Sequence, residues 1–325
     1  MAPKVYTLRA LTDIWTGDAQ GKPDRMITTG LLGSIRWWFE IVVRGLGGSA
    51  CDPTKKGNRC PVSDKKPTEP GHHCVVCEFF GCTGWARKFR FEVLDQSGKT
   101  KAAQIKKDDV LQFRFTALRR VCKQEWALLH LTLRLIAEYG AIGGKTVYKP
   151  SDEASRQDAP HHRDYGLVVI QQHPEDTPSF SREELEAYVA RPRWHRPGHD
   201  DFAWASLANF WCVKGRYLAR QDSNTSTFNR VIGRPEPKSQ AAQGDSWVAG
   251  RRARGQPNPQ QPESKKVFSF KEPARTFGFV ERKTEIDSLF GTLDQLLSNE
   301  WDNFSDSEIM TPERILNELF KRSNS

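Results

Sequence analysis

Cysteine residues gather in one short stretch of this chain, where they could hold a metal ion. Five of the seven cysteines fall between residues 51 and 82. Clustered cysteines of this kind indicate metal binding rather than a disulfide framework. A Cys-x2-Cys pair sets two thiolates for one tetrahedral Zn²⁺, and a set of four sulfurs leaves no open position for catalysis. We therefore expect a structural zinc site, whose ligands would be Cys51, Cys60, Cys74 and Cys77. The fourth ligand is open between Cys51, His72, His73 and Cys82.

A glycine-rich segment at 140–146, GAIGGKT, could contact phosphate groups. Its end resembles a nucleotide-binding P-loop, but its first glycine is one position off and the segment follows a helical pattern rather than a strand. A nucleotide site is therefore not expected. The backbone amides of Gly143 and Gly144 and the side chain of Lys145 could instead approach an RNA backbone. A helix C-cap is the alternative role for these glycines.

Two adjacent histidines raise the question of catalysis. His161 and His162 lie near Tyr165 and, if the loop folds back, within reach of Lys145. Such side chains can supply the acid, the base and the charge stabilisation for metal-independent RNA cleavage. Paired histidines in a loop are more often simply exposed, and nothing in the sequence fixes their geometry. We expect no catalytic residues.

The excess of positive charge lies in residues 1–283, whereas the last part of the chain is acidic. The formal net charge is +9, but residues 284–325 hold nine acidic and three basic residues. Residues 1–283 therefore hold 46 basic and 31 acidic residues, a net charge of +15. Such a body favours a polyanion such as nucleic acid, although a generic basic surface would look the same. The segment 234–266 is rich in Gly, Pro and Gln, and a mobile loop of this kind could bind RNA through Arg251, Arg252 and Arg254.

The elements that must position these groups follow from hydrophobic periodicity. Apolar residues recur at helical spacing over 31–46 and 123–139, and Thr28 or Thr29 could cap the first helix. Alternation predicts strands, which we place at 4–12, 85–95, 109–117 and 167–170. The order β-α-β-β-α-β is that of the ferredoxin-like unit used by RNA-recognition domains. On the polar strand faces we expect Lys88, Arg90 and Arg114 to meet a phosphate backbone, or else to form a plain solvated face.

The second half is less regular. A capping box at Ser181 and Glu184 predicts a helix over 181–188. Residues 207–218 and 267–280 are typical of strands, and residues 285–297 and 312–321 of helices. We expect an α+β protein with tandem ferredoxin-like (RRM-like) domains, a zinc-knuckle insertion and long loops. The first domain would span 1–178 with its Cys-rich insertion at 48–84, and the second, degenerate one would span 179–325.

Three segments together resemble one protein family. They are Thr29–Trp38 (TGLLGSIRWW), Cys77–Arg87 (CEFFGCTGWAR) and the glycine loop at 140–145. In this order and spacing they look like the RAMP superfamily, and in particular the first-numbered RAMP subunit of type III-B (Cmr) CRISPR effector complexes. Carried over by motif, Arg36, Trp37, Arg87 and the glycine loop would contact RNA or neighbouring subunits. RAMP glycine loops usually continue directly into an aromatic-Gly pair, whereas Tyr165-Gly166 follows here about twenty residues after Lys145.

The resemblance implies a non-catalytic, RNA-binding subunit that helps capture target RNA near the 3′ end of the guide RNA in antiviral defence. Its partners would be guide RNA, target RNA and other RAMP subunits, with no small-molecule substrate. Two alternatives are a metal-independent endoribonuclease of the same superfamily and a scaffold that binds proteins only. No stretch of 18 to 20 uncharged apolar residues occurs, so we expect no membrane span and a cytoplasmic location.

Overall fold

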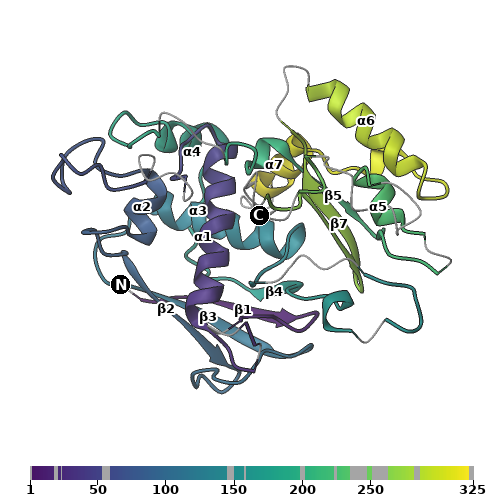
Figure 1. Ribbon diagram of the computed structural model, residues 1–325. Helices are drawn as coiled ribbons and strands as arrows, with labels where there is room; N and C mark the ends of the chain where they lie inside the picture. Colours follow the sequence, from purple (N-terminus) through teal and green to yellow (C-terminus); the bar gives the residue numbers. More distant parts are fainter. Residues whose placement is uncertain are drawn as a thin grey trace, which may run out of the picture. The chain divides into compact units, whose positions relative to one another are not determined.

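The fold is known from a computed structural model, and Figure 1 shows its ribbon. The structure describes residues 2–17, 21–22, 24–52, 59–144, 150–156, 159–197, 202–222, 225–234, 247–250, 263–281 and 286–321, without the side chains of 286–290. Contacts divide the chain into two compact units. Unit 1 comprises 1–145, 165–208 and 313–325, and unit 2 comprises 146–164 and 209–312. Both units are discontinuous, whereas the sequence analysis placed a single boundary after residue 178. That boundary stays a prediction about independently folding domains.

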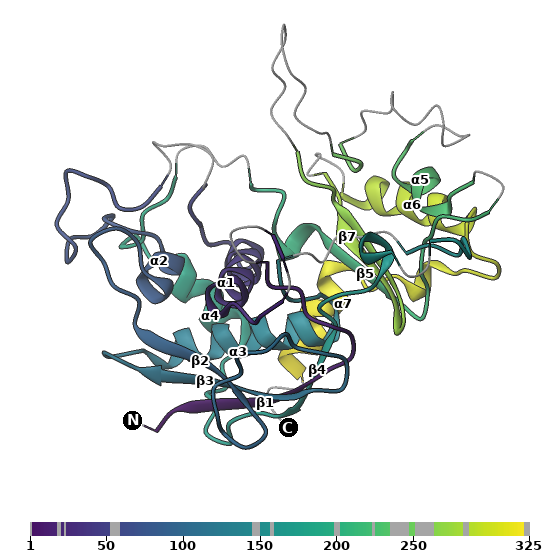
Figure 2. The ribbon, with the colours of Figure 1, turned by 60° about the horizontal axis from the view of Figure 1, so that its bottom comes forward.

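Unit 1 is built on a four-stranded antiparallel sheet of the order β2-β3-β1-β4. The strands are β1 (Lys4–Ala10), β2 (Phe89–Asp95), β3 (Val110–Ala117) and β4 (Val168–Gln172). Helices α1 (Thr28–Gly45) and α3 (Lys123–Glu138) lie on one side of this sheet, and neither view shows a described helix over the opposite side (Figures 1 and 2). The predicted β-α-β-β-α-β order is confirmed.

The helical face of the sheet carries a largely aromatic core. Alternate residues of the strands point into it, among them Tyr6, Phe89 and Phe115. The Phe89 ring lies 4.6 Å from the Phe79 ring, and the Tyr6 ring meets Phe115 edge-on at 6.1 Å. Burying such side chains stabilises the fold by roughly 1.5–3 kcal/mol each. The period-2 pattern therefore fixes which face of the sheet is covered.

Helix ends agree with the sequence in part. Ser181 caps α4 (Arg182–Val189) with Glu184 completing the capping box, as predicted. The predicted cap of α1 is wrong, because Ile27 occupies the N-cap without a side-chain bond and Thr28 is already helical. Helix α2 (Val75–Phe80) begins inside the Cys-rich insertion. Helix α7 (Pro312–Lys321) also belongs to unit 1, where Arg134 of α3 donates to its Leu319 and Glu318 carbonyls.

Unit 2 contains a three-stranded antiparallel sheet of the order β5-β7-β6. Its strands are β5 (Phe210–Lys214), β6 (Val267–Lys271) and β7 (Ala274–Phe279). Residues 267–280 therefore form a hairpin rather than a single strand. Helices α5 (Thr227–Val231) and α6 (Ile286–Ser298) and the one-turn helices η2 (Pro160–His162), η3 (Leu207–Asn209) and η5 (Asp306–Glu308) complete the described elements.

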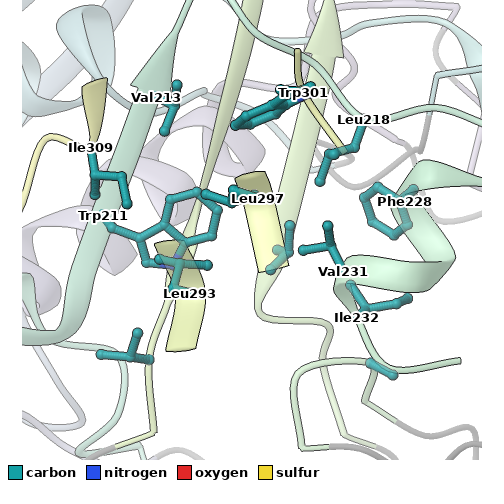
Figure 3. Packing of buried hydrophobic residues seen from close by; sticks show 13 residues of the cluster. Trp211, Val213, Leu218, Phe228, Val231, Ile232, Leu293, Leu297, Trp301 and Ile309 are labelled. Carbon is teal, nitrogen blue, oxygen red and sulfur yellow. The ribbon is translucent and has the colours of Figure 1, made fainter. Parts of the chain in front are cut away.

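A separate apolar core holds unit 2 together (Figure 3). Trp211 of β5 and Leu293 and Leu297 of α6 are buried in it, together with Phe228 of α5. The Trp301 indole donates to the Tyr217 carbonyl at 2.9 Å, which satisfies its only polar group inside the core. Antiparallel strands with helices agree with the predicted degenerate second unit. Most of the predicted loop at 234–266, including Arg251, Arg252 and Arg254, lies outside the described residues.

Candidate metal centre and RNA-binding surfaces

Four buried cysteines converge in unit 1. The Sγ atoms of Cys51, Cys60, Cys74 and Cys77 all lie within 4.8 Å of one another. Cys51 Sγ is 3.8 Å from Cys74 Sγ and 3.5 Å from Cys77 Sγ. Tetrahedral coordination at a Zn–S distance of ~2.3 Å separates ligand sulfurs by about 3.8 Å. The cluster therefore has the dimensions of a four-sulfur metal site.

Hydrogen bonds within the cluster lower the pKa of Cys51 and Cys77 and raise that of Cys60, so two of the four sulfurs favour the thiolate form that binds metal. The Cys60 and Cys74 amides donate to Cys51 Sγ at 3.2 Å and Cys60 Sγ at 3.1 Å. Arg36 Nη2 donates to Cys77 Sγ at 3.2 Å. Hydrogen bonding within the cluster, from Cys51 above all, lowers the pKa of Cys77 to about 4. Cys77 thus needs no strong base to lose its proton.

The other candidates for the fourth ligand lie outside the set of four, although the Cys82 thiol hydrogen-bonds to Cys77. His72 Nδ1 lies 2.7 Å from His73 Nδ1, and His73 Nε2 lies 2.6 Å from Glu78 Oε2. Cys82 is half-buried and is not one of the four clustered cysteines. Among the described residues, the sulfur of Cys51 therefore completes the set of four.

Arg36 belongs to this cluster rather than to an open surface. Besides Cys77, its guanidinium bonds the Gly81 carbonyl at 3.0 Å and Glu40 Oε1 at 3.2 Å. All three of its nitrogens are therefore engaged inside unit 1. The helix position that its motif marks faces the cysteine loop, and the RNA or subunit contact expected of Arg36 stays a prediction.

Lys88 is buried, whereas the strand alternation predicted an exposed side chain. It precedes β2, and its side chain is buried between two carboxylates. Lys88 Nζ lies 2.7 Å from Glu125 Oε1 and in contact with Glu78. The strand alternation that predicted an exposed Lys88 does not extend to this position. Its ammonium group pairs with two buried carboxylates, and its phosphate contact stays a prediction that these pairs disfavour.

The open face of the sheet carries the remaining predicted arginines. Arg90 and Arg114 lie on it as expected, with side chains 58% and 33% exposed. Both pair with Glu92, which Arg114 binds through two nitrogens at 3.1 and 3.0 Å and Arg90 Nε approaches to 3.2 Å. Arg9 of β1 lies on the same face with its side chain 44% exposed; it was not among the predicted contacts, although the alternation of residues 4–10 indicates its position. Glu92 neutralises part of this charge.

The glycine loop packs closely against α1. Trp38 Nε1 donates to the Ala141 carbonyl at 2.8 Å, and a Cβ atom on Gly140 would lie 2.6 Å from the Trp38 ring. The Gly143 amide donates to Ser34 Oγ at 3.1 Å and the Gly144 amide donates to the Trp15 carbonyl at 2.8 Å, so both amides already have partners. Gly140 is buried by this packing, whereas Gly143 is half-buried and Gly144 is exposed. The last glycines are thus the part of the loop that a ligand could reach.

The aromatic-Gly pair Tyr165-Gly166 lies beside the glycine loop in the structure, although about twenty residues separate them in the sequence. The Ile142 amide donates to the Gly166 carbonyl at 2.8 Å, and the Tyr165 ring meets Trp15 edge-on at 5.2 Å. Gly166 has φ +89°, and a Cβ atom there would lie 2.0 Å from the Ile142 carbonyl oxygen. Only glycine fits this close approach. The intervening residues therefore form an insertion that leaves the aromatic-Gly pair beside the loop.

Other predicted positions differ in exposure. Trp37 is half-buried and meets Trp38 edge-on at 5.0 Å, and Arg87 is half-exposed. Lys145 lies outside the described residues. In η2, His162 is buried and His161 is exposed, while Tyr165 is buried. Of the histidines and tyrosine considered for catalysis, only His161 is therefore open to solvent.

Comparison with known proteins agrees with the motif resemblance. Residues 7–148 match the family model described as the RAMP superfamily. The matched segment makes up less than half of the chain. The match spans the sheet strands β1 to β3, both covering helices and the start of the glycine loop. The resemblance read from the sequence is thereby confirmed for this part of the chain.

Solved structures similar to the whole chain include Cmr1 from Pyrococcus furiosus in its apo form. It is 12% identical with a TM-score of 0.45, and the match covers 93% of this chain and 98% of that one. A chain of the type III-B Cmr-beta complex bound to cognate target RNA and AMPPnP is 8% identical with a TM-score of 0.43, covering 98% and 99%. No curated protein matches the sequence. Among the described helices, none combines the length and apolarity needed to cross a lipid bilayer.

Proposed function

We propose that this protein is a non-catalytic, RNA-binding subunit of a type III-B CRISPR ribonucleoprotein. It would help capture target RNA near the 3′ end of the guide RNA, beside other RAMP subunits in the cytoplasm. The observation that carries the proposal is the RAMP segment 7–148, which leads from a ferredoxin-like sheet into a glycine loop with an exposed tip. The Thr29–Trp38 and Cys77–Arg87 motifs support the type III-B assignment.

Two surfaces of unit 1 would contact RNA. The first is the open sheet face, where Arg9, Arg90 and Arg114 lie. The second is the loop tip at Gly143 and Gly144, where the absence of a side chain leaves room for the RNA backbone, while both amides stay bonded to Ser34 and Trp15. Phosphate contacts of this kind position RNA without reading its sequence. Trp37, Arg87, Lys145, Arg251, Arg252 and Arg254 remain predicted contacts.

Zinc is our proposal for the metal that the four cysteines would hold. Four thiolates at these separations suit a closed tetrahedral site, which stabilises a loop of low apolar content. We further propose that the chain cleaves no RNA. A concerted acid–base mechanism needs several reachable groups, and His162 and Tyr165 are both buried.

RNA binding is tested on the purified full chain with a fluorescent single-stranded RNA, by anisotropy over a range of salt concentrations. We expect binding to weaken as salt rises, because released counterions dominate phosphate recognition. The double variant Arg9→Gln, Arg90→Gln should lower the slope of log K against log salt by about 1.4, because each lost phosphate contact on a single strand contributes about 0.7. The matched control, Lys66→Gln with Lys99→Gln, removes the same charge from exposed positions elsewhere on unit 1.

Equal slopes for the sheet variant and the control would contradict the assignment of the sheet face. Absence of RNA binding by the unmodified chain would contradict the function itself. The same RNA incubated with excess protein in EDTA should stay intact, and its cleavage would favour the endoribonuclease alternative.

A further inference from the structure

A cavity of about 510 Å³ opens in unit 1, away from the glycine loop. One wall comes from the Cys-rich insertion, a second from the turn that leads into α3, and a third from the end of α4. Five cationic and two acidic side chains line it, so it carries an excess of three positive charges. Four of the cationic residues are arginines, namely Arg119, Arg120, Arg191 and Arg193.

The guanidinium groups of three of these arginines lie over aromatic rings of the same cavity. The guanidinium carbon of Arg119 is 3.9 Å from the centre of the Trp85 ring. Those of Arg191 and Arg193 are 4.7 Å from Tyr188 and 4.8 Å from Trp194. A stacked guanidinium keeps its planar face for a further ring and its edge donors for an anion. The walls thus pair planar surfaces with positive charge.

The rings are held in fixed positions. The Trp194 indole donates to the Tyr188 carbonyl at 2.8 Å, and the two rings lie 5.6 Å apart. On the opposite wall the Trp85 ring stacks on His73 at 4.8 Å. A ligand ring would therefore meet surfaces that are already ordered, which lowers the entropy cost of binding.

The floor of the cavity does not repel an anion. Glu78 and Glu125 both pair with Lys88, and Glu78 also bonds His73 at 2.6 Å. Tyr188 adds a hydrogen bond from its hydroxyl to Glu125 at 3.3 Å. Both carboxylates therefore already have partners inside unit 1. The positive charge of the arginines at the walls remains for a ligand.

We propose that this arginine–aromatic cavity binds an unpaired nucleotide of a single-stranded RNA. Its base would stack on the guanidinium and ring layers, and its phosphate would meet Arg191, Arg193 and Arg120. Unpaired bases are commonly bound by stacking on aromatic rings and on arginine planes. The volume lies within the ~300–1,000 Å³ of small-ligand pockets, enough for one nucleotide and too small for a duplex. An acidic peptide would need only the positive charge of the cavity. The aromatic rings beside the arginines offer stacking surfaces, which favour a nucleotide base as the ligand.

This inference rests on the proposed function and adds a second RNA contact, formed by the Cys-rich insertion and the end of α4. It also gives the insertion a role in binding. Trp85 follows the metal cluster by eight residues, so the metal that orders the insertion would also hold one wall of the cavity.

The test uses the full chain with Arg191→Gln and Arg193→Gln together. Both side chains are exposed after the end of α4, so the fold should persist. We expect single-stranded RNA to bind about tenfold more weakly, because stacking and phosphate contacts are lost together. The charge-matched control, Lys66→Gln with Lys99→Gln, should lose less than about threefold. RNA carrying 5-iodouridine should cross-link on irradiation to peptides containing Trp85, Tyr188 or Trp194, and the cross-links should disappear in the double variant.

Each other outcome overturns the proposal in a recognisable way. If the unmodified chain binds RNA but the cavity variant matches the control, this inference fails and the proposed function stands. If the unmodified chain binds no RNA, both fail. Cross-linking suppressed by micromolar uridine monophosphate, with RNA affinity unchanged in the variant, would assign the cavity to a free nucleotide. Displacement of the RNA from the cavity by a poly-glutamate of equal charge would assign it to an acidic peptide.

Discussion

The close approach of Gly166 to the glycine loop gives the sharpest prediction for stability. In Gly166→Ala, the new Cβ atom would lie 2.0 Å from the Ile142 carbonyl oxygen and 3.0 Å from the Ile142 amide nitrogen. Both atoms are backbone, so no side-chain rotation relieves the overlap. The residue also has φ +89°, a conformation that alanine adopts only with strain.

The magnitude follows from these contacts. A left-handed conformation costs alanine about 1 kcal/mol relative to glycine. Relieving the overlap must separate the two segments and break the Ile142–Gly166 hydrogen bond of 2.8 Å, which contributes about 1 kcal/mol. Displacing a packed backbone in a buried region adds a cost of at least ~1 kcal/mol. We therefore expect the free energy of unfolding to fall by about 3 kcal/mol or more.

Two controls separate the causes. Gly47 has φ +81°, and a Cβ atom added there would meet no other described part of the chain within 4 Å, so Gly47→Ala should cost only about 1 kcal/mol. Gly140→Ala tests close contact without positive φ, because its Cβ would lie 2.6 Å from the Trp38 ring. Urea unfolding followed by far-UV circular dichroism measures all three. A loss for Gly166→Ala within about 0.5 kcal/mol of that for Gly47→Ala would refute the argument.

Three further predictions concern the metal, a buried ion pair and pH. Native mass spectrometry should find a single zinc ion per chain. Cys60→Ser should lose this ion and should also melt at a lower temperature. An unmodified chain that holds no zinc, or a Cys60→Ser variant with an unchanged melting temperature, would contradict this prediction. Lys88→Met should cost about 3–5 kcal/mol in urea unfolding, because it leaves two carboxylates buried without their cation, and adding Glu125→Gln should recover part of that loss. Burial raises the pKa of Asp164 from 3.8 to about 6, so the folded chain binds its proton more tightly than the unfolded chain does. This contribution to the free energy of unfolding is present below pH ~4 and is lost as pH rises through about 6, and it amounts to roughly 3 kcal/mol at most. Asp164→Asn should flatten this part of the profile of stability against pH. A variant whose profile matches that of the unmodified chain would contradict the prediction.

The sequence did not reveal the partners of two cations, and the reason is the same for both. Arg36 and Lys88 were assigned from motif and strand alternation, which describe a residue's own element. Their partners come from elsewhere in the chain, since Gly81 lies 45 residues after Arg36 and Glu125 lies 37 residues after Lys88. A lone positive residue and one that is paired inside the protein look alike in the sequence. Exposure, rather than charge, separates Arg90 from Lys88.

Local periodicity determined the β-α-β-β-α-β order, because side-chain direction repeats every two residues in a strand and every 3.6 in a helix. The Cys-x2-Cys spacing likewise indicated the metal cluster, since two of its ligands come from one turn of chain. Only the tertiary structure decided that Cys51 completes the cluster, that Gly166 returns to Ile142, and that arginines from two distant segments meet Trp85, Tyr188 and Trp194 in one cavity. These arrangements join residues far apart in the chain. They depend on which surfaces pack together, and no local pattern encodes that choice.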